Sequence, residues 1–142
     1  MANMVLNTLE IIGNENDYKL IIDFFSNLEN ENKKDPYMGV SFFGDYIYDI
    51  SLYGDFVLFE TKYSPNFETL QNFLKSLKLN CKIKLSYENL DNHLLGVAFI
   101  DVELIHDVFV TDEEFETYYN DEDDDNSILL EILNKKMLNL TF

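Results

Sequence analysis

The chain has 142 residues, of which 46% are hydrophobic and 15% aromatic, so it can bury the core of one domain and is not globally disordered. Its formal net charge of -17, with ten lysines and no arginine, opposes direct binding to nucleic acid, because that binding requires cations to meet phosphates. A single cysteine excludes an internal disulfide and a cysteine-based zinc site. No signal peptide or membrane-length apolar run is visible, so we expect a protein of the cytoplasm.

The N-terminal segment predicts a strand followed by a helix. Residues Val5 to Ile12 are typical of a strand, and Asn14 or Asn16 can cap the next helix. The following stretch, residues 27–35, is polar and charged and ends before Pro36. We therefore expect this stretch to be a surface loop. The predicted apolar face of the helix consists of Tyr18, Ile21, Ile22, Phe25 and Leu28.

Two alternating segments in the middle of the chain predict a β-hairpin. Residues 46–53 alternate, with Tyr46, Tyr48, Ile50 and Leu52 forming one apolar face, and residues 56–59 resume the apolar pattern. Gly54-Asp55 lies between them and suits a two-residue turn. Ser64 and Pro65 then suit the cap and first position of a second helix. Its predicted buried face consists of Phe67, Leu70, Leu74 and Leu77.

The next segment predicts two further strands. Residues Cys81 to Tyr87 alternate between apolar and polar side chains, which indicates a half-buried strand with the cysteine in the core. Residues 89–92 suit a turn. Residues Leu94 to Ile105 are apolar enough for one long strand, with Gly96 as a possible bulge.

The C-terminal third differs in composition from the rest of the chain. Thr111 can cap a short acidic helix that runs to Tyr119, because carboxylates in a first turn stabilise the helix dipole. Residues 120–126 form a charged break, and residues 129–140 have the apolar spacing of a last amphipathic helix.

The order of these elements predicts an α+β protein. Strand–helix–strand–strand–helix–strand matches a ferredoxin-like antiparallel sheet with two helices on one face. We expect one domain over residues 1–142, in which residues 1–110 form the ferredoxin-like core and residues 111–142 form a C-terminal acidic helical extension.

One short motif resembles a known family. The segment Phe59 to Pro65, followed by a helix and a strand that ends in Tyr87-Glu88, is similar to the phage- and plasmid-encoded ferredoxin-like proteins called Api-like. Members typically open with a short asparagine-containing strand, which Asn3 and Asn7 resemble. They also carry an aromatic residue after Thr-Lys, which is Tyr63 here in place of the usual tryptophan.

The resemblance covers roughly residues 1–105, and the chain departs from the family after Glu88, where the usual glycine-rich continuation is missing. The activity of the family is unknown. The resemblance therefore implies a fold and an origin in a mobile genetic element, and it favours a phage accessory or anti-defence role. The acidic C-terminal part falls outside the matched region.

Catalytic and metal-binding patterns are incomplete. Asp121, Asp123 and Asp125 occupy the first, third and fifth positions of an EF-hand loop, but Asn126 stands in place of its glycine and Ile132 in place of its last glutamate. Neither histidine belongs to a zinc motif, and the glycines form no phosphate-binding loop. We therefore predict no enzyme, no cofactor and no metal site, with a divalent-metal-binding protein as an open alternative.

The acidic run from Asp112 to Asp125 carries nine carboxylates in fourteen residues, with aromatic side chains among them. A like-charge block of this kind is either a solvated connector or a surface held for a basic partner. Carboxylates fixed on a folded surface can imitate a phosphate backbone and occupy a Lys/Arg groove. The predicted partner-binding residues are Asp112, Glu113, Glu114, Glu116, Tyr118, Tyr119, Asp121, Glu122, Asp123, Asp124 and Asp125.

These observations predict a small acidic inhibitor from a phage or mobile element. It would act in the cytoplasm of the host cell as an anti-CRISPR or other anti-defence protein. Its partner would be the basic groove of a nucleic-acid-binding effector complex, without direct contact to nucleic acid or membrane. A structural or accessory phage protein, whose acidity serves only solubility, is the alternative. The sequence leaves the oligomeric state open.

Overall fold

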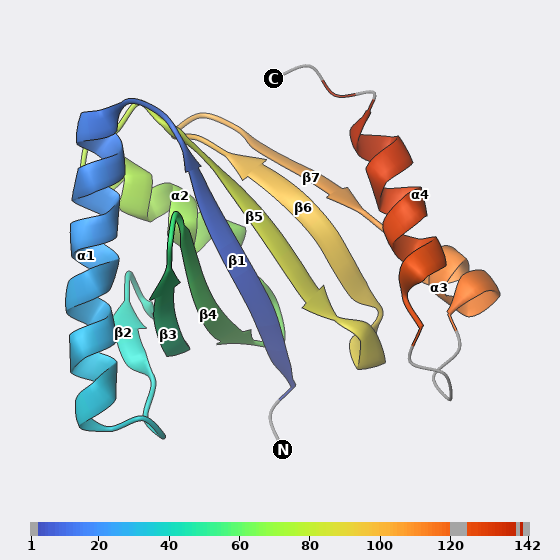
Figure 1. The fold of residues 1–142 in the computed structure, drawn as a ribbon, viewed down its shortest axis with the longest axis horizontal. Coiled ribbons are helices and arrows are strands. Elements are labelled where there is room, and N and C mark those ends of the chain that lie inside the picture. The colour runs from blue at the N-terminus through green and yellow to red at the C-terminus, as the bar shows by residue number, and fades with distance from the viewer. Residues whose placement is uncertain (1–2, 120–124, 139, 141–142) are drawn as a thin grey trace.

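The computed structural model describes residues 3–119, 125–138 and 140, which form an antiparallel sheet with helices on both faces (Figure 1). In chain order the elements are β1 (Met4–Ile12), α1 (Glu15–Lys34), β2 (Val40–Phe42), β3 (Asp45–Tyr53), β4 (Phe56–Lys62), α2 (Phe67–Ser76), β5 (Lys82–Asn89), the 3-10 turn η1 (Leu90–Asn92), β6 (Leu94–Ile100), β7 (Ile105–Phe109), α3 (Asp112–Tyr118) and α4 (Ser127–Met137).

The α+β prediction is confirmed. The described strands form one seven-stranded sheet in the order β2-β3-β4-β1-β5-β6-β7, and each pair of neighbours is antiparallel. The sheet is larger than that of a simple ferredoxin-like fold, because β2 extends one edge and β6 and β7 extend the other.

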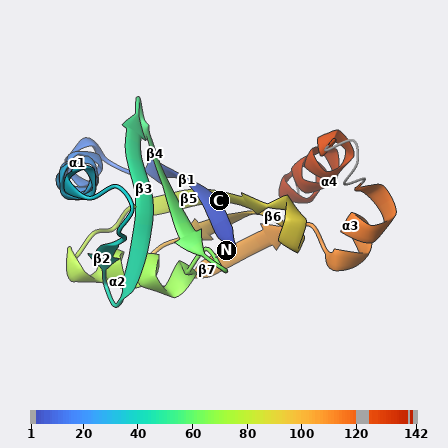
Figure 2. The same cartoon turned by 90° about the horizontal axis from the view of Figure 1, so that it is seen from below.

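The first face of the sheet is covered by α1 and α2, as predicted. Phe25 of α1 and Phe73 of α2 are fully buried and pack edge to face, with ring centroids 5.5 Å apart. Both rings also contact Phe42 of β2. Val5, Leu9, Ile83 and Leu85 contribute the floor of this core from the two central strands. Figure 2 shows both helices toward the β2–β3 side of the sheet, away from α3 and α4.

The prediction of a loop at residues 27–35 was wrong, because α1 continues through this polar stretch to Lys34. The polar side chains of its last turns bind the backbone of the sheet. Asn32 is buried, and its Oδ1 accepts a hydrogen bond of 3.1 Å from the Ile50 amide. Its Nδ2 donates to the Met38 carbonyl, and a carboxylate oxygen of Glu29 accepts from the Leu52 amide. These side chains bind two amides of β3 and a carbonyl of the segment that precedes β2.

The single apolar face predicted for residues 46–53 was also wrong. The register between β3 and β4 shifts between Tyr48 and Ser51, and Asp49 has a φ of 51° in the left-handed region. Ile47 and Ile50 are both buried, although a regular strand would place them on opposite faces. The bulge therefore brings Ile50 to the first face. Tyr48 lies on the second face, where the ammonium of Lys62 lies 5.0 Å from its ring centroid.

The long strand predicted for residues 94–105 is a hairpin of β6 and β7. Asp101 Oδ1 accepts hydrogen bonds from the amides of Glu103 and Leu104, and this side chain closes the turn. The predicted bulge at Gly96 was wrong, because the register of β5 and β6 is regular there. Gly96 instead leaves room for the Tyr87 ring, whose hydroxyl oxygen would lie only 2.3 Å from an added Cβ.

The second helix begins later than predicted. Asn66, with a left-handed φ of 56°, precedes Phe67, and its side chain makes no cap hydrogen bond. The Ser64 hydroxyl donates to the Asn66 side chain instead of capping the helix. Cys81 is buried, as predicted, and burial raises the pKa of its thiol to about 11, so the thiol is not poised as a nucleophile.

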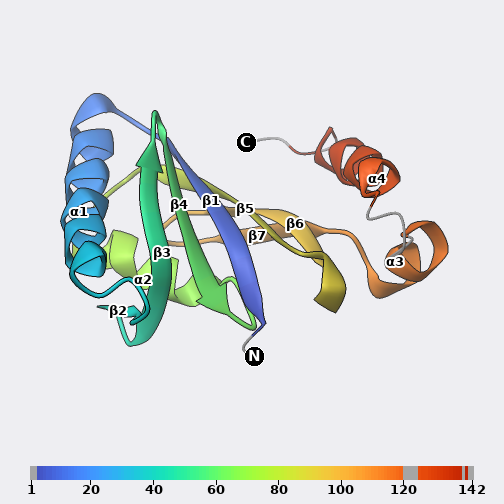
Figure 3. The same cartoon turned by 60° about the horizontal axis from the view of Figure 1, so that its bottom comes forward.

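The second face of the sheet is only partly covered. A separate core joins β6 and β7 to α3 and α4, and it includes Leu95, Val97, Phe115, Leu129 and Leu133. No helix lies over β1, β4 or β5 in the view of Figure 3, where these strands face the reader. The two predicted C-terminal helices are therefore present, and they cover one end of this face.

Candidate functional site

The acidic helix α3 is stabilised by its N-terminal cap and is held against the protein by Phe115. At its N-terminus the Thr111 hydroxyl accepts a hydrogen bond from the Glu114 amide, and the Glu114 carboxylate accepts one from the Thr111 amide. This reciprocal pair is a capping box. In the middle of the helix Phe115 is only 1% exposed, and its ring stacks on His93 with centroids 4.8 Å apart. The Tyr119 ring packs edge to face on Phe115 at the other end.

Three carboxylates of α3 face solvent. Asp112, Glu113 and Glu116 are exposed, and no lysine forms an ion pair with any of them within the described residues. The His93 imidazole lies beside them, with its Nδ1 3.6 Å from Asp112 Oδ1. Tyr118 is half exposed beside them. We call this surface the α3 acidic face.

Glu114 has a structural role in addition to its predicted one. Its Oε1 accepts hydrogen bonds from the Thr111 amide and from the ammonium of Lys136 on α4. The hydrogen bond from Lys136 holds the pKa of the Glu114 carboxyl below its usual value, and the bond from Thr111 adds to this effect. Lys136 also donates to the Phe109 carbonyl of β7 at 2.9 Å. Glu114 thus joins α3 to α4 and is less available to a partner than its neighbours.

The remaining predicted site residues fall in two groups. Asp125 is exposed immediately before α4, where its carboxylate accepts a hydrogen bond from the Ser127 amide, and this bond lowers its pKa. Asp121, Glu122, Asp123 and Asp124 lie outside the described residues. The EF-hand alternative depends on these positions and stays a prediction.

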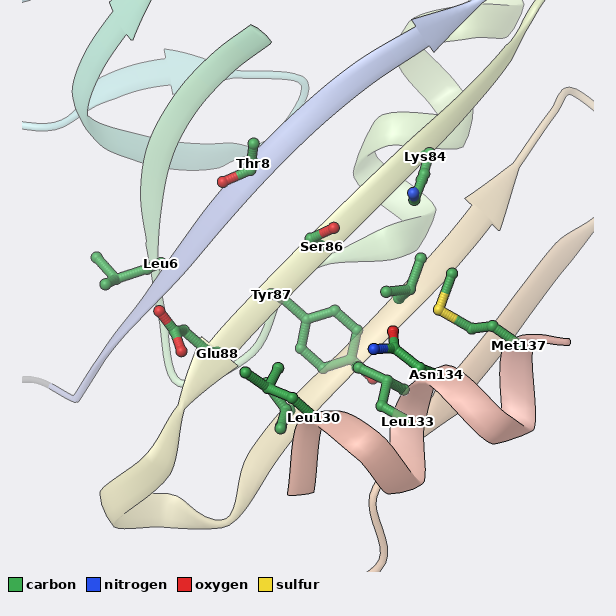
Figure 4. A pocket seen from close by; sticks show the side chains of 13 residues that line it. Leu6, Thr8, Lys84, Ser86, Tyr87, Glu88, Leu130, Leu133, Asn134 and Met137 are labelled. Carbon is green, nitrogen blue, oxygen red and sulfur yellow. The ribbon is translucent and has the colours of Figure 1, made fainter. Parts of the chain in front are cut away.

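A cavity of about 310 Å³ lies between α4 and the central strands, and we call it the α4 trough (Figure 4). Alternate residues of β5, namely Lys84, Ser86 and Glu88, line its floor. From β1, Leu6 and Thr8 border the floor on one side. Side chains of α4 form the other wall, and these are Leu130, Leu133, Asn134 and Met137. The trough is therefore apolar at its walls and polar along its floor.

The open sheet face continues from the trough across β1 to β4. Leu6 is 49% exposed, Leu58 is 37% exposed and Phe56 is 40% exposed. The register aligns Leu6 with Glu60 of β4 on one side and with Glu88 of β5 on the other. Leu6 thus lies between two carboxylates on the same face. The sequence did not reveal this arrangement, because it depends on which strands are neighbours.

Within the described residues, no group of three or more metal-ligating side chains comes together. The buried hydrogen bond from the Tyr87 hydroxyl to Asp107, 2.6 Å long, spans β6 and secures the edge strand β7. Burial raises the pKa of both groups, which suits a structural link between the strands.

Comparisons cover family models, curated proteins and solved structures. None of the three yields a match to this chain. Among the helices described, none combines the length and the apolar character that crossing a bilayer requires. The proposals below therefore depend on the geometry of the chain itself.

Proposed function

We propose that the protein is a small acidic inhibitor from a phage or another mobile element, and that it binds the basic nucleic-acid groove of a host defence complex such as a CRISPR effector. The observation that carries this proposal is the attachment of α3. Phe115 and the capping box fix the helix, so that Asp112, Glu113 and Glu116 are held outward together.

A fixed set of carboxylates binds a basic groove better than a mobile one. Asp112 and Glu116 are one turn apart, so they lie on one side of the helix, about 5–6 Å apart at their Cβ atoms. Ordering a mobile acidic tail would cost conformational entropy on binding, and an ordered helix avoids this cost. The net charge of -17 accelerates the encounter with a cationic groove, and this effect weakens as salt rises.

The test measures inhibition of target-DNA binding by a purified CRISPR effector complex. The triple variant Asp112→Asn, Glu113→Gln, Glu116→Gln is compared with a control in which Glu15→Asn, Asp23→Asn and Glu31→Gln remove the same charge from exposed positions of α1. We expect wild type and control to inhibit at low salt and the α3 triple variant to lose about tenfold or more in potency.

The comparison separates the local effect from the effect of total charge. If both variants lose potency equally, general acidity is responsible and the α3 acidic face is not the binding surface. If wild type inhibits none of a panel of CRISPR effectors and other basic nucleic-acid-binding complexes at low salt, the inhibitor proposal is rejected. The accessory or structural role then becomes the better explanation.

A further inference from the structure

The α4 trough has the shape of a docking groove and exposes large apolar side chains. Leu6 on β1 and Leu130, 41% exposed on α4, stand on its two sides (Figure 4). Leu58 extends the apolar surface by one strand. Burying an exposed leucine side chain stabilises a complex, so these positions favour an occupant with apolar side chains of its own.

The charges beside Leu6 favour cations on the occupant, whereas Lys84 lies four residues from Glu88 along β5, on the trough floor. Glu60 and Glu88 flank Leu6, and no lysine forms an ion pair with either carboxylate within the part of the chain that the structure describes. Burial raises the pKa of Glu60, and the negative charge of Asp49 raises it further. A cation placed beside Glu60 would stabilise its charged form and so oppose both effects. An arginine or lysine of the occupant supplies such a cation.

Charge also argues against other occupants. A second copy of the chain would bring another net charge of -17 to the same surface. Nucleic acid and anionic lipid headgroups are repelled by the same field. A basic protein segment is attracted by it.

We propose that the α4 trough binds an amphipathic helix of the basic partner, with its leucine-like side chains on Leu6 and Leu130 and its lysines or arginines beside Glu60 and Glu88. A basic amphipathic helix presents apolar side chains on one face and cations at the edges of that face, which matches leucines flanked by carboxylates. The inference deepens the proposed function, because it rests on a basic partner that also meets the α3 acidic face on the other side of α4.

The test uses a fluorescein-labelled amphipathic helical peptide of leucine and lysine, with a serine-and-lysine peptide of equal charge as its control. Binding is followed by fluorescence anisotropy at low salt and at about 150 mM salt, where screening weakens exposed charge pairs. We expect wild type to prefer the leucine peptide. We expect Leu6→Thr with Leu130→Gln to weaken its binding about tenfold or more, since two apolar contacts are lost.

Matched controls make the result specific. Leu20→Gln on α1 and Leu104→Thr in the β6–β7 turn remove two leucines that are equally exposed elsewhere, and this pair should bind the peptide within about twofold of wild type. Glu60→Gln with Glu88→Gln should weaken binding at low salt more than Glu15→Gln with Glu31→Gln on α1. Thermal melts of each variant show that the fold is retained.

Three outcomes overturn the proposal. One is equal binding of the leucine and serine peptides. The second is peptide binding by the Leu6/Leu130 variant within about twofold of wild type, which makes the trough irrelevant. The third is a wild-type dimer in sedimentation that this variant converts to a monomer, because a second copy then occupies the trough. The peptide assay contains no effector, so a failure of the inhibitor proposal does not alter its result.

Discussion

The two faces of the sheet are built differently. The first face packs against α1 and α2 through a core of 20 buried residues, rich in phenylalanine. The second face has a core of 8 buried residues, confined to β6, β7, α3 and α4, and its other strands are open. The larger core has enough apolar surface to determine the stability of the domain. The smaller core holds charged and apolar side chains in place at the surface.

This difference assigns the larger buried core to one face, and the proposed binding surfaces lie on or beside the other. A surface that binds a partner must remain exposed, so it cannot contribute fully to the folding free energy. The following three substitutions test this division, from the largest expected effect to the smallest.

Phe25→Ala should have the largest effect. The ring is fully buried and lies between 5.5 and 6.1 Å from the rings of Phe42, Phe59 and Phe73. Its removal leaves a cavity in the larger core and should lower the free energy of unfolding by about 3–5 kcal/mol. Urea denaturation measures this loss. Leu20→Ala, at an exposed position of the same helix, should change the free energy by about 0.5 kcal/mol or less.

Phe115→Ala should have a smaller and more local effect. The smaller core loses its central ring, at a cost of about 3 kcal/mol, and a helix of seven residues is not stable without such an anchor. Hydrogen exchange should show loss of protection in α3 while β1 and β5 keep theirs. Equal loss in α3 and β1 would contradict the division, because it would show one cooperative core. Tyr118→Ala, at a half-exposed position, is the control.

Glu114→Gln should have the smallest effect and a specific pH dependence. Because the folded-state pKa of Glu114 is lowered from 4.5, its ion pair stabilises the fold above that pH, and this contribution is lost as the pH falls through the lowered value. We expect a loss of about 0.5–1 kcal/mol at neutral pH, reduced by solvent screening.

Urea denaturation at pH 7 and near pH 3 measures this dependence. The difference between wild type and Glu114→Gln should shrink as the pH falls through the lowered pKa, because the wild-type carboxyl then becomes neutral as well. Glu113→Gln removes the same charge without the hydrogen bonds of Glu114 and should show no comparable loss at pH 7. A loss that stays the same at both pH values would assign the effect to the capping box alone.

Much of the fold could be predicted from periodicity and turn residues. The alternation in β5, the Gly54-Asp55 turn and the Thr111 cap are local signals, and the structure confirms the elements that they predict. The errors concern side chains whose partners are distant in sequence. The polar neighbours of Asn32 in the sequence suit a loop, because its hydrogen-bond partner Ile50 on β3 is distant in sequence. Asp101 closes a hairpin within a run of apolar residues.

The candidate site was predictable to a smaller extent. The acidic composition of α3 is visible in the sequence, and its capping residues predict a helix. The stacking of His93 on Phe115 is not predictable, because it requires η1 and α3 to meet. The α4 trough is less predictable still, because Leu6 and Leu130 are distant in sequence and border the same cavity only through the register of β1 and β5.

Strand β6 has six consecutive buried residues, from Leu95 to Ile100. Apart from Gly96, which has no side chain, they contribute alternately to the two cores. The strand therefore separates the two cores and contributes side chains to both. The chain contains no tryptophan, so the fluorescence of a tryptophan introduced at Phe99 would come from the smaller core, beneath α3 and α4, with no other tryptophan signal. Ala98, one position earlier, belongs to the larger core. Tryptophan fluorescence at position 98 or 99 would thus show which of the two cores changes when a ligand is added.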